Sequence, residues 1–258
     1  MATRVMGVLN VTPDSFSDGG RWTDPEQAVA HGLRMVAEGA DVVDVGGEST
    51  RPGAAPVDPA EECRRVLAVV AGLAPHVRVS IDTRKVTVAE AALAAGATLV
   101  NDVSASLWPV AAAAGAGWVA MHMQGEPATM QRQPHYDDVV AEVRALLVQR
   151  ARQAAAAGVA EVWIDPGIGF GKTLEHNVTL LAQLGELVGT GYPVLVGASR
   201  KGFLGRLLGD APPDDRLEGS LAVAVWAATQ GAGMVRAHDV AATVAAMVLV
   251  GERPLAPA

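Results

Sequence analysis

Short runs of apolar residues alternate with longer alanine- and leucine-rich segments along the whole chain. The short runs have the length and composition of buried strands, and the longer segments have helical patterning. Strands are predicted over Val5–Leu9, Val42–Val45, Val77–Ile81, Thr98–Val100, Trp118–Met121, Val162–Ile164, Val194–Val196 and Met234–Val235. Helices are predicted over Pro25–Ala37, Ala60–Ala71, Val86–Ala95, Asp137–Ala157, Leu174–Leu187, Leu217–Thr229 and Val240–Val250.

This alternation continues without a break in composition, which favours a parallel sheet in a single domain over residues 1–258. Eight strand–helix repeats in about 250 residues is the count of a (β/α)8 TIM barrel, and we predict that fold. A doubly wound open sheet is the alternative. Its usual G-x-G-x-x-G motif after the first strand is missing here.

Composition argues against some classes of binding partner and indicates in which cellular compartment the protein is found. The net charge is −8 with only 20 Lys and Arg residues, which argues against a nucleic-acid or anionic membrane surface. Cys63 is the only cysteine, so no internal disulfide can form and a reducing compartment is expected. The longest uncharged stretch, Gly219–Val235, is interrupted by Gln230 and glycines, so no membrane span is predicted. We expect a soluble, cytoplasmic protein.

Polar residues follow the predicted strands. Their ends carry Asn10, "GGESTRPG", Asp82, Asn101-Asp102, His122, Asp165, "ASRKG", and Arg236 with His238. One aspartate at a strand end is most often a helix N-cap. In a barrel, however, all these ends meet at one rim, where active sites form. Buried carboxylates need donors, and for Asp82 and Asp165 we expect ligand N–H groups or Lys201.

One phosphate-binding motif is excluded. The stretch "DPGIGFGKT" follows a strand as a P-loop does, but G-x-x-x-x-G-K-[ST] requires glycine where this chain has Pro166.

Several motifs together resemble the dihydropteroate synthase family. They are "VMGVLNVTPDSFSDGG", "DVGGESTRPGA", "VSIDTRK", "NDVSA", "MHMQGEPATMQ", "IDPGIGFGKT", "GASRKGFLG", "RLEGSLAVAV" and "VRAHDV". They occur in family order from about Val5 to the final helix. The resemblance implies a TIM barrel that joins 4-aminobenzoate to 6-hydroxymethyl-7,8-dihydropterin diphosphate in folate synthesis. It also implies a sulfonamide target.

The resemblance assigns the pterin site. Asp165 would accept two parallel bonds from the amino group and ring N–H of the pterin edge, as a carboxylate does from arginine. Asn101 would meet a neighbouring edge, Asp82 the other side, and Lys201 the carbonyl and ring nitrogen. Met121 and Phe170 would pack on the ring, although Met121 could be plain core and Phe170 a loop anchor. The implied catalytic residues are Lys201, Asp82, Asp165 and Arg236.

The diphosphate needs cations, and the resemblance assigns them to Arg236 and His238, with Thr50 and Arg51 nearby. Asn10 and Asp18 would hold Mg²⁺ bound to the diphosphate. Magnesium prefers oxygen ligands and substrate phosphates, so no cluster of histidine and cysteine is expected.

The resemblance gives the polar stretch "NVTPDSFSDGG" a role as one of two loops that close over the site. In the family, this loop and "STRPG" order together around 4-aminobenzoate, with Phe16 over its ring and Pro52 in its wall. Thr50, Arg51, Phe170, Lys201 and Gly202 would complete the site. A closed loop keeps water from a reactive intermediate. The alternative is a solvated loop with an incidental phenylalanine.

Two features depart from the family. Gly202 stands where some members have serine, so only the backbone N–H groups of Gly202 and Ser199 could bind the benzoate carboxylate. The segment between the fourth and fifth strands is short, which predicts a fourth helix of about two turns. Two alternative functions are open to this sequence. One is a pterin-binding methyltransferase, which would not need Asn10, Lys201, Arg236 and His238. The other is a paralogue that binds pterin without turnover.

The late helices predict a homodimer. Leu217–Gln230 and Val240–Val250 are apolar over more than one face, and Leu221–Thr229 contains no charged residue. A barrel's outer helix normally has a polar face toward water, and a large exposed apolar patch marks an interface. The alternative is an alanine-rich surface without a partner. Trp226 would lie near the interface or in the barrel wall.

Overall fold

The structure is a computed structural model that describes residues 2–12, 25–49, 56–127 and 129–254. Its centre is one parallel sheet of eight strands in the order β6-β5-β4-β3-β2-β1-β8-β7. The strands are β1 (Arg4–Asn10), β2 (Val42–Gly46), β3 (Arg78–Asp82), β4 (Leu99–Asp102), β5 (Gly117–Met121), β6 (Val162–Asp165), β7 (Leu195–Gly197) and β8 (Met234–Ala237).

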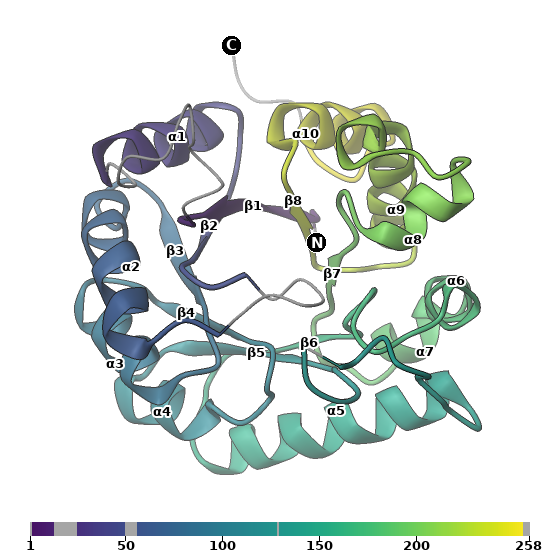
Figure 1. Ribbon diagram of the computed structural model, residues 1–258, viewed down its shortest axis with the longest axis horizontal. Coiled ribbons are helices and arrows are strands. Elements are labelled where there is room, and N and C mark those ends of the chain that lie inside the picture. The colour runs from purple at the N-terminus through teal and green to yellow at the C-terminus, as the bar shows by residue number, and fades with distance from the viewer. Residues whose placement is uncertain (1, 13–24, 50–55, 128, 255–258) are drawn as a thin grey trace.

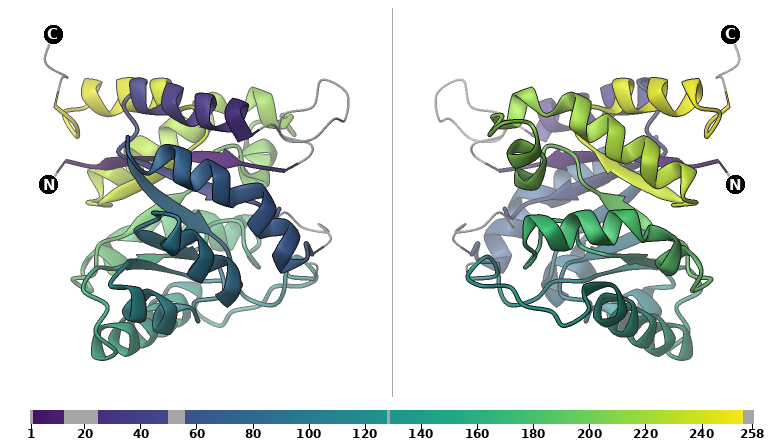
Figure 2. Two further views of the ribbon diagram at one scale, coloured as in Figure 1. Left: turned by 90° about the vertical axis from the view of Figure 1, so that its left-hand side faces the viewer. Right: turned by 90° about the vertical axis from the view of Figure 1, so that its right-hand side faces the viewer.

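The sheet curls into a barrel that closes between β6 and β7. There, Ile164 forms a parallel bridge with Val194, and its N–H donates to the carbonyl oxygen of Pro193 at 3.0 Å. The helices surround the strands (Figure 1), and the side views show them along the outside of the sheet (Figure 2). The TIM-barrel prediction is confirmed, and the open-sheet alternative is wrong.

The helices agree with the predicted segments, with two differences. They are α1 (Pro25–Ala37), α2 (Pro59–Leu73), α3 (Val86–Ala94), α4 (Trp108–Ala114), α5 (Val139–Ala156), α6 (Leu174–Ala182), α7 (Leu184–Val188), α8 (Gly202–Leu207), the 3-10 helix η1 (Pro213–Asp215), α9 (Leu217–Thr229) and α10 (Val240–Leu249). The helix predicted over Leu174–Leu187 breaks at Gln183 into α6 and α7, and α8 was not predicted. The short fourth helix is confirmed, since α4 has 7 residues.

Two apolar layers fill the molecule. The larger one lies between the strands and the helices and includes Val43, Val70 and Leu147. The smaller one is the cluster Met6, Val42, Leu99, Val119, Trp163, Leu195 and Met234, one residue from nearly every strand. Side chains two residues apart on a strand face the same side. The barrel interior therefore continues above the smaller cluster with the residues two positions further along each strand.

Those next interior positions are mostly polar. They are Val8, Asp44, Asn101, Met121, Asp165, Gly197 and Arg236, which lie toward the carboxyl ends of the strands. The opposite end of the barrel is where β1 begins beside the end of α10, with Thr3 N–H donating to Glu252 O at 3.0 Å. Among the described residues, no helix is long and apolar enough to cross a membrane.

Candidate active site

A cluster of buried charge lies in the polar layer of the barrel. Arg236 on β8 donates from Nε to Asp44 Oδ2 at 2.6 Å and from Nη2 to Asp82 Oδ2 at 2.8 Å. Asn101 donates from Nδ2 to the same Asp44 oxygen at 2.9 Å. Strand register brings these groups together, because Asp82 pairs with Gly46 on one side and with Asn101 on the other. Arg236 therefore holds two carboxylates at once.

This geometry adds one residue and corrects one expectation. Asp44, fully buried on β2, was not predicted as part of the site. We expected Lys201 or a ligand to supply the donor for Asp82, whereas the protein donor is Arg236. Arg236 was predicted mainly for the diphosphate. If its guanidinium contacts a bound phosphate, it does so while Nε and Nη2 still donate to Asp44 and Asp82.

Several buried oxygens in this cluster lack a donor. Asp44 Oδ1, Asp82 Oδ1, Asn101 Oδ1 and Ser80 Oγ form no hydrogen bond with any part of the chain that the structure describes. A buried acceptor left unpaired costs about 1–3 kcal/mol. Three such acceptors around one arginine form a surface complementary to a flat ligand that carries several N–H donors.

A second group of polar residues lies at the ends of β6 and β7. Asp165 accepts from Gly167 N–H at 2.7 Å, and Lys201 Nζ donates to the carbonyl oxygen of Ile168. Lys201 Nζ also lies 4.5 Å from the centre of the Phe170 ring. The Phe170 ring therefore lies beside Lys201, the predicted catalytic lysine.

Burial shifts the pKa values of these groups toward neutrality. It raises the pKa of Asp82 to about 7, with Arg236 and Lys201 acting against the rise and Asp44 and Glu62 adding to it. It raises the pKa of Asp165, which Lys201 and the Gly167 N–H partly offset. It lowers the pKa of Lys201 to about 8 against the pull of Asp165. Strongly shifted groups gathered in one place are typical of a catalytic site.

Two polar strand ends do not face the site. Asp102 turns out of the barrel and accepts from the backbone N–H groups of Ser104, Ser106 and Leu107 and from Trp118 Nε1. His122 turns toward the buried Lys172, whose Nζ lies 3.0 Å from His122 Nδ1. The expectation that all strand-end polar residues face one rim is therefore wrong for these two, because adjacent strand residues point to opposite faces.

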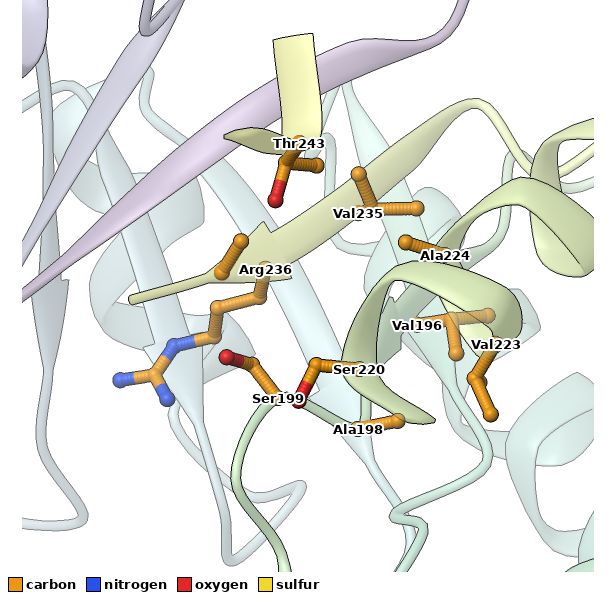
Figure 3. A pocket seen from close by; sticks show the side chains of 10 residues that line it. Val196, Ala198, Ser199, Ser220, Val223, Ala224, Val235, Arg236 and Thr243 are labelled. Atoms are coloured by element: carbon orange, nitrogen blue, oxygen red, sulfur yellow. The ribbon is translucent and has the colours of Figure 1, made fainter. Parts of the chain in front are cut away.

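The loops after β7 and β8 are tied together. His238 N–H donates to Ser199 Oγ at 3.1 Å, and Arg200 forms two bonds with Asp239, at 3.0 and 2.6 Å. Arg200 has a left-handed φ of 59°, which the double ion pair helps to hold. Figure 3 shows Ser199 beside Arg236, whose guanidinium extends away from the small cavity behind β7 and β8.

A charged cluster joins the two ends of segment 49–56. Glu48 accepts from Val57 N–H at 2.8 Å and pairs with Lys85, which also pairs with the buried Glu62. Sequence patterning gave no signal for this cluster. The predicted residues Phe16, Asp18, Thr50, Arg51 and Pro52 lie outside the described residues.

Magnesium was expected at Asn10. Asn10 ends β1 and pairs in register with Gly46, so its amide lies at the mouth of the barrel near Asp82. An amide oxygen suits Mg²⁺, which takes the remainder of its ligands from water and substrate phosphate. The described residues contain no group of three or more His, Cys, Asp or Glu side chains that could hold a metal. This donor set fits an ion that arrives with a phosphate ligand.

Comparisons with known proteins identify the family. A family model described as pterin binding enzyme matches residues 6–238. A dihydropteroate synthase of Mycobacterium leprae is 53% identical over 96% of this chain and 92% of its own. Two solved structures have a TM-score of 0.91. The dihydropteroate synthase of Yersinia pestis with a sulfonamide drug complex is 47% identical and covers 97% of this chain and 94% of its own. That of Xanthomonas albilineans with 4-aminobenzoic acid is 48% identical and covers 99% and 94%.

Proposed function

The chain belongs to the dihydropteroate synthases of the pterin binding enzyme family, and from this we propose how its barrel rim carries out their reaction. The enzyme joins 6-hydroxymethyl-7,8-dihydropterin diphosphate to 4-aminobenzoate and releases 7,8-dihydropteroate and pyrophosphate. It is a transferase of folate synthesis. The observation that carries the proposal is the group of unpaired oxygens on Asp44, Asp82 and Asn101, because a pterin edge supplies N–H donors to such a surface.

The pterin ring lies in the polar layer of the barrel. Asp165 accepts from the amino group and the ring N–H, each charge-assisted bond contributing about 1.5–3 kcal/mol. Asp82 and Asn101 accept from the opposite side of the ring, and Lys201 donates to its carbonyl and ring nitrogen. Met121 packs on the ring, and its pairing in register with Asp165 supports this role.

The diphosphate lies over Arg236, His238 and Asn10. Asn10 and Asp18 would hold Mg²⁺, which would supply positive charge against the diphosphate. Thr50 and Arg51 complete this side. A pterin-binding methyltransferase would have no diphosphate leaving group to bind, so the cationic pair Arg236 and Lys201 favours the synthase.

The benzoate lies at the outer edge, between Phe16, Pro52 and Phe170. Gly202 is the first residue of α8, where backbone N–H groups have no partner within the helix. These N–H groups can hold the benzoate carboxylate. A Cβ added at Gly202 would meet nothing within 4 Å, so the serine of other family members would fit here as well.

The chemistry is a displacement at the pterin methylene. The C–O bond to the diphosphate breaks, the amine nitrogen of 4-aminobenzoate forms the new C–N bond, and the amine loses a proton. Asp82 and Asp165 stabilise the positive charge that develops on the ring, and Arg236 stabilises the negative charge that develops on the leaving group. The loops that carry Phe16 and Arg51 exclude water from the methylene.

The protein acts as one domain in the cytoplasm and as a homodimer. Support for the dimer comes from exposed apolar side chains on the two late helices: Trp226 on α9 is 43% exposed and Leu249 on α10 is 86% exposed. Trp226 Nε1 donates to Leu181 O at 2.7 Å, so its ring lies across α6 and not in the barrel wall.

Turnover tests the function. The purified protein is incubated with the pterin diphosphate, 4-aminobenzoate and Mg²⁺, and pyrophosphate and dihydropteroate are measured. Formation of both products in equal amounts supports the proposal. Pterin binding without product would instead identify a paralogue that does not catalyse the reaction.

A further inference from the structure

Lys172 is a buried lysine that the reaction described above does not use. Its side chain is almost fully buried, and its Nζ lies 2.9 Å from the carbonyl oxygens of both Gly167 and Phe170. It also lies 3.0 Å from His122 Nδ1 and 3.4 Å from His122 O. In its charged form a lysine has three donors and no acceptor, so these contacts satisfy it fully. Burial lowers the pKa of Lys172 to about 7, against the pull of Asp165.

The contacts join two segments that are distant in sequence. Gly167 and Phe170 belong to the loop 166–172 after β6, and His122 follows β5 directly. Burial and the neighbouring Lys172 lower the pKa of His122 to about 3. At neutral pH the imidazole is therefore uncharged, and its Nδ1 lone pair can accept from the lysine.

The loop 166–172 is pressed against the end of β5 without side chains between them. Gly167 and Gly171 have φ angles of 64° and 59°. A Cβ at Gly167 would lie 1.8 Å from His122 O, and one at Gly171 would lie 2.3 Å from Gln124 O. Tyr136 Oη donates to Gly171 O at 2.9 Å from the same side. At these two glycines the backbones meet without side chains between them, so hydrogen bonds hold the contact there, while the fully buried Ile168 packs the same loop into the apolar core.

The same loop carries atoms of the active site. Asp165 accepts from Gly167 N–H, Lys201 Nζ donates to Ile168 O, and the Phe170 ring lies beside that amine. A shift of the loop would move Asp165, Lys201 and Phe170 relative to one another. Displacements of about 1 Å at such groups can cost about 100-fold in rate.

We propose that Lys172 is a positioning residue of this enzyme, which fastens loop 166–172 to the end of β5 and so aligns Asp165, Phe170 and Lys201 with the pterin ring. The inference rests on the proposed function, because it names the pterin as the ligand that is aligned. Lys172 does not touch the substrate. Its effect is larger on pterin binding than on benzoate binding, because Asp165 serves the pterin alone, whereas Phe170 and Lys201 also line the benzoate side.

The test compares Lys172→Met with a matched control. Methionine keeps the length of the side chain and removes the charge and the donors. Leu147→Ala, in the buried face of α5, lowers stability without touching the loop. Both variants are measured by calorimetry with the pterin diphosphate and Mg²⁺, by steady-state kinetics, and by thermal unfolding.

We expect Lys172→Met to raise the Kd for the pterin diphosphate at least 10-fold and to raise the KM for 4-aminobenzoate by a smaller factor. Leu147→Ala should lower the melting temperature and leave the Kd within 2-fold of the unaltered protein. If Lys172→Met does not fold, His122→Phe removes one acceptor and keeps a ring beside Tyr136. It should raise the same Kd about 3-fold.

Three results distinguish the claims. Unchanged pterin affinity in folded Lys172→Met, or in His122→Phe where Lys172→Met does not fold, overturns the positioning role. An equal loss in Leu147→Ala reduces Lys172 to a stability residue and also overturns it. Absence of turnover by the unaltered protein overturns the proposed function, and the inference falls with it.

Discussion

Replacing Asp44 with asparagine removes one negative charge from the floor of the active site and keeps the shape of the side chain. Asp44 Oδ2 accepts from Arg236 Nε at 2.6 Å and from Asn101 Nδ2 at 2.9 Å. Losing a charge-assisted bond costs about 1.5–3 kcal/mol, and removing one partner of a buried ion pair about 3–5 kcal/mol. Because Asp82 still pairs with Arg236, we expect a loss at the low end of the second range, about 3 kcal/mol. That corresponds to about a 150-fold loss in kcat/KM.

The same substitution should move the pH profile. Asp82 must be ionised to accept from the pterin, and its pKa of about 7 predicts that kcat/KM falls as the pH drops below about 7. The charge of Asp44 contributes to the raised pKa of Asp82. In Asp44→Asn the pKa of Asp82 should therefore decrease, and the acid limb should move to lower pH.

A pyrophosphate-release assay across pH 5 to 9 measures both effects. Asp102→Asn is the matched control, because Asp102 is equally buried but bonds only to groups outside the barrel. The control should lower the melting temperature and leave the acid limb in place. A profile for Asp44→Asn with the same kcat/KM and the same limb would refute the reasoning.

Three further predictions follow from the proposed site. Asp165→Asn should lose about 2–4 kcal/mol of transition-state stabilisation with little change in melting temperature, because an amide N–H then faces a ligand N–H; near-normal turnover would remove Asp165 from the site. Calorimetry should show weak 4-aminobenzoate binding until pyrophosphate and Mg²⁺ are present, and equal affinities would count against ordered binding. Light scattering at micromolar concentration should give the mass of a dimer for the unaltered protein and a lower mass for Trp226→Lys. A monomer mass for the unaltered protein would refute the dimer.

The sequence predicted the barrel well because its signals are local. Each strand is a short apolar run, and each is followed by a helix of distinct composition. The break between α6 and α7 was missed because it falls at Gln183, with neither proline nor glycine at that residue. α8 was missed because six residues with two glycines read as a loop.

The site was predicted in part, for a physical reason. Asp82, Asn101, Asp165 and Arg236 lie at strand ends, where polar residues were sought, and all of them face the interior. Asp44 was missed because it lies within a strand, where one charge among valines gave no signal on its own. Only the folded barrel shows that Val42 belongs to the inner apolar layer, and that the Asp44 side chain, two residues further along the strand, therefore also faces the interior.

The same alternation explains the wrong expectations. Asp102 and His122 each lie one residue beyond an interior position, Asn101 and Met121, and therefore face outward. Composition cannot distinguish the two faces at a strand end. The fastening role of Lys172 was likewise hidden, because its partners are backbone carbonyls and a histidine fifty positions away in sequence.

The central claim is that buried carboxylate and amide oxygens in the barrel, with Asp165 facing the 2-amino group, receive the N–H donors of a pterin. Calorimetry with 6-hydroxymethylpterin and with its analogue carrying oxygen in place of the 2-amino group tests this most directly. A site built around a donor rejects a ligand that lacks it. We predict that the analogue binds at least 10-fold more weakly, and equal affinities for the two compounds would contradict the account.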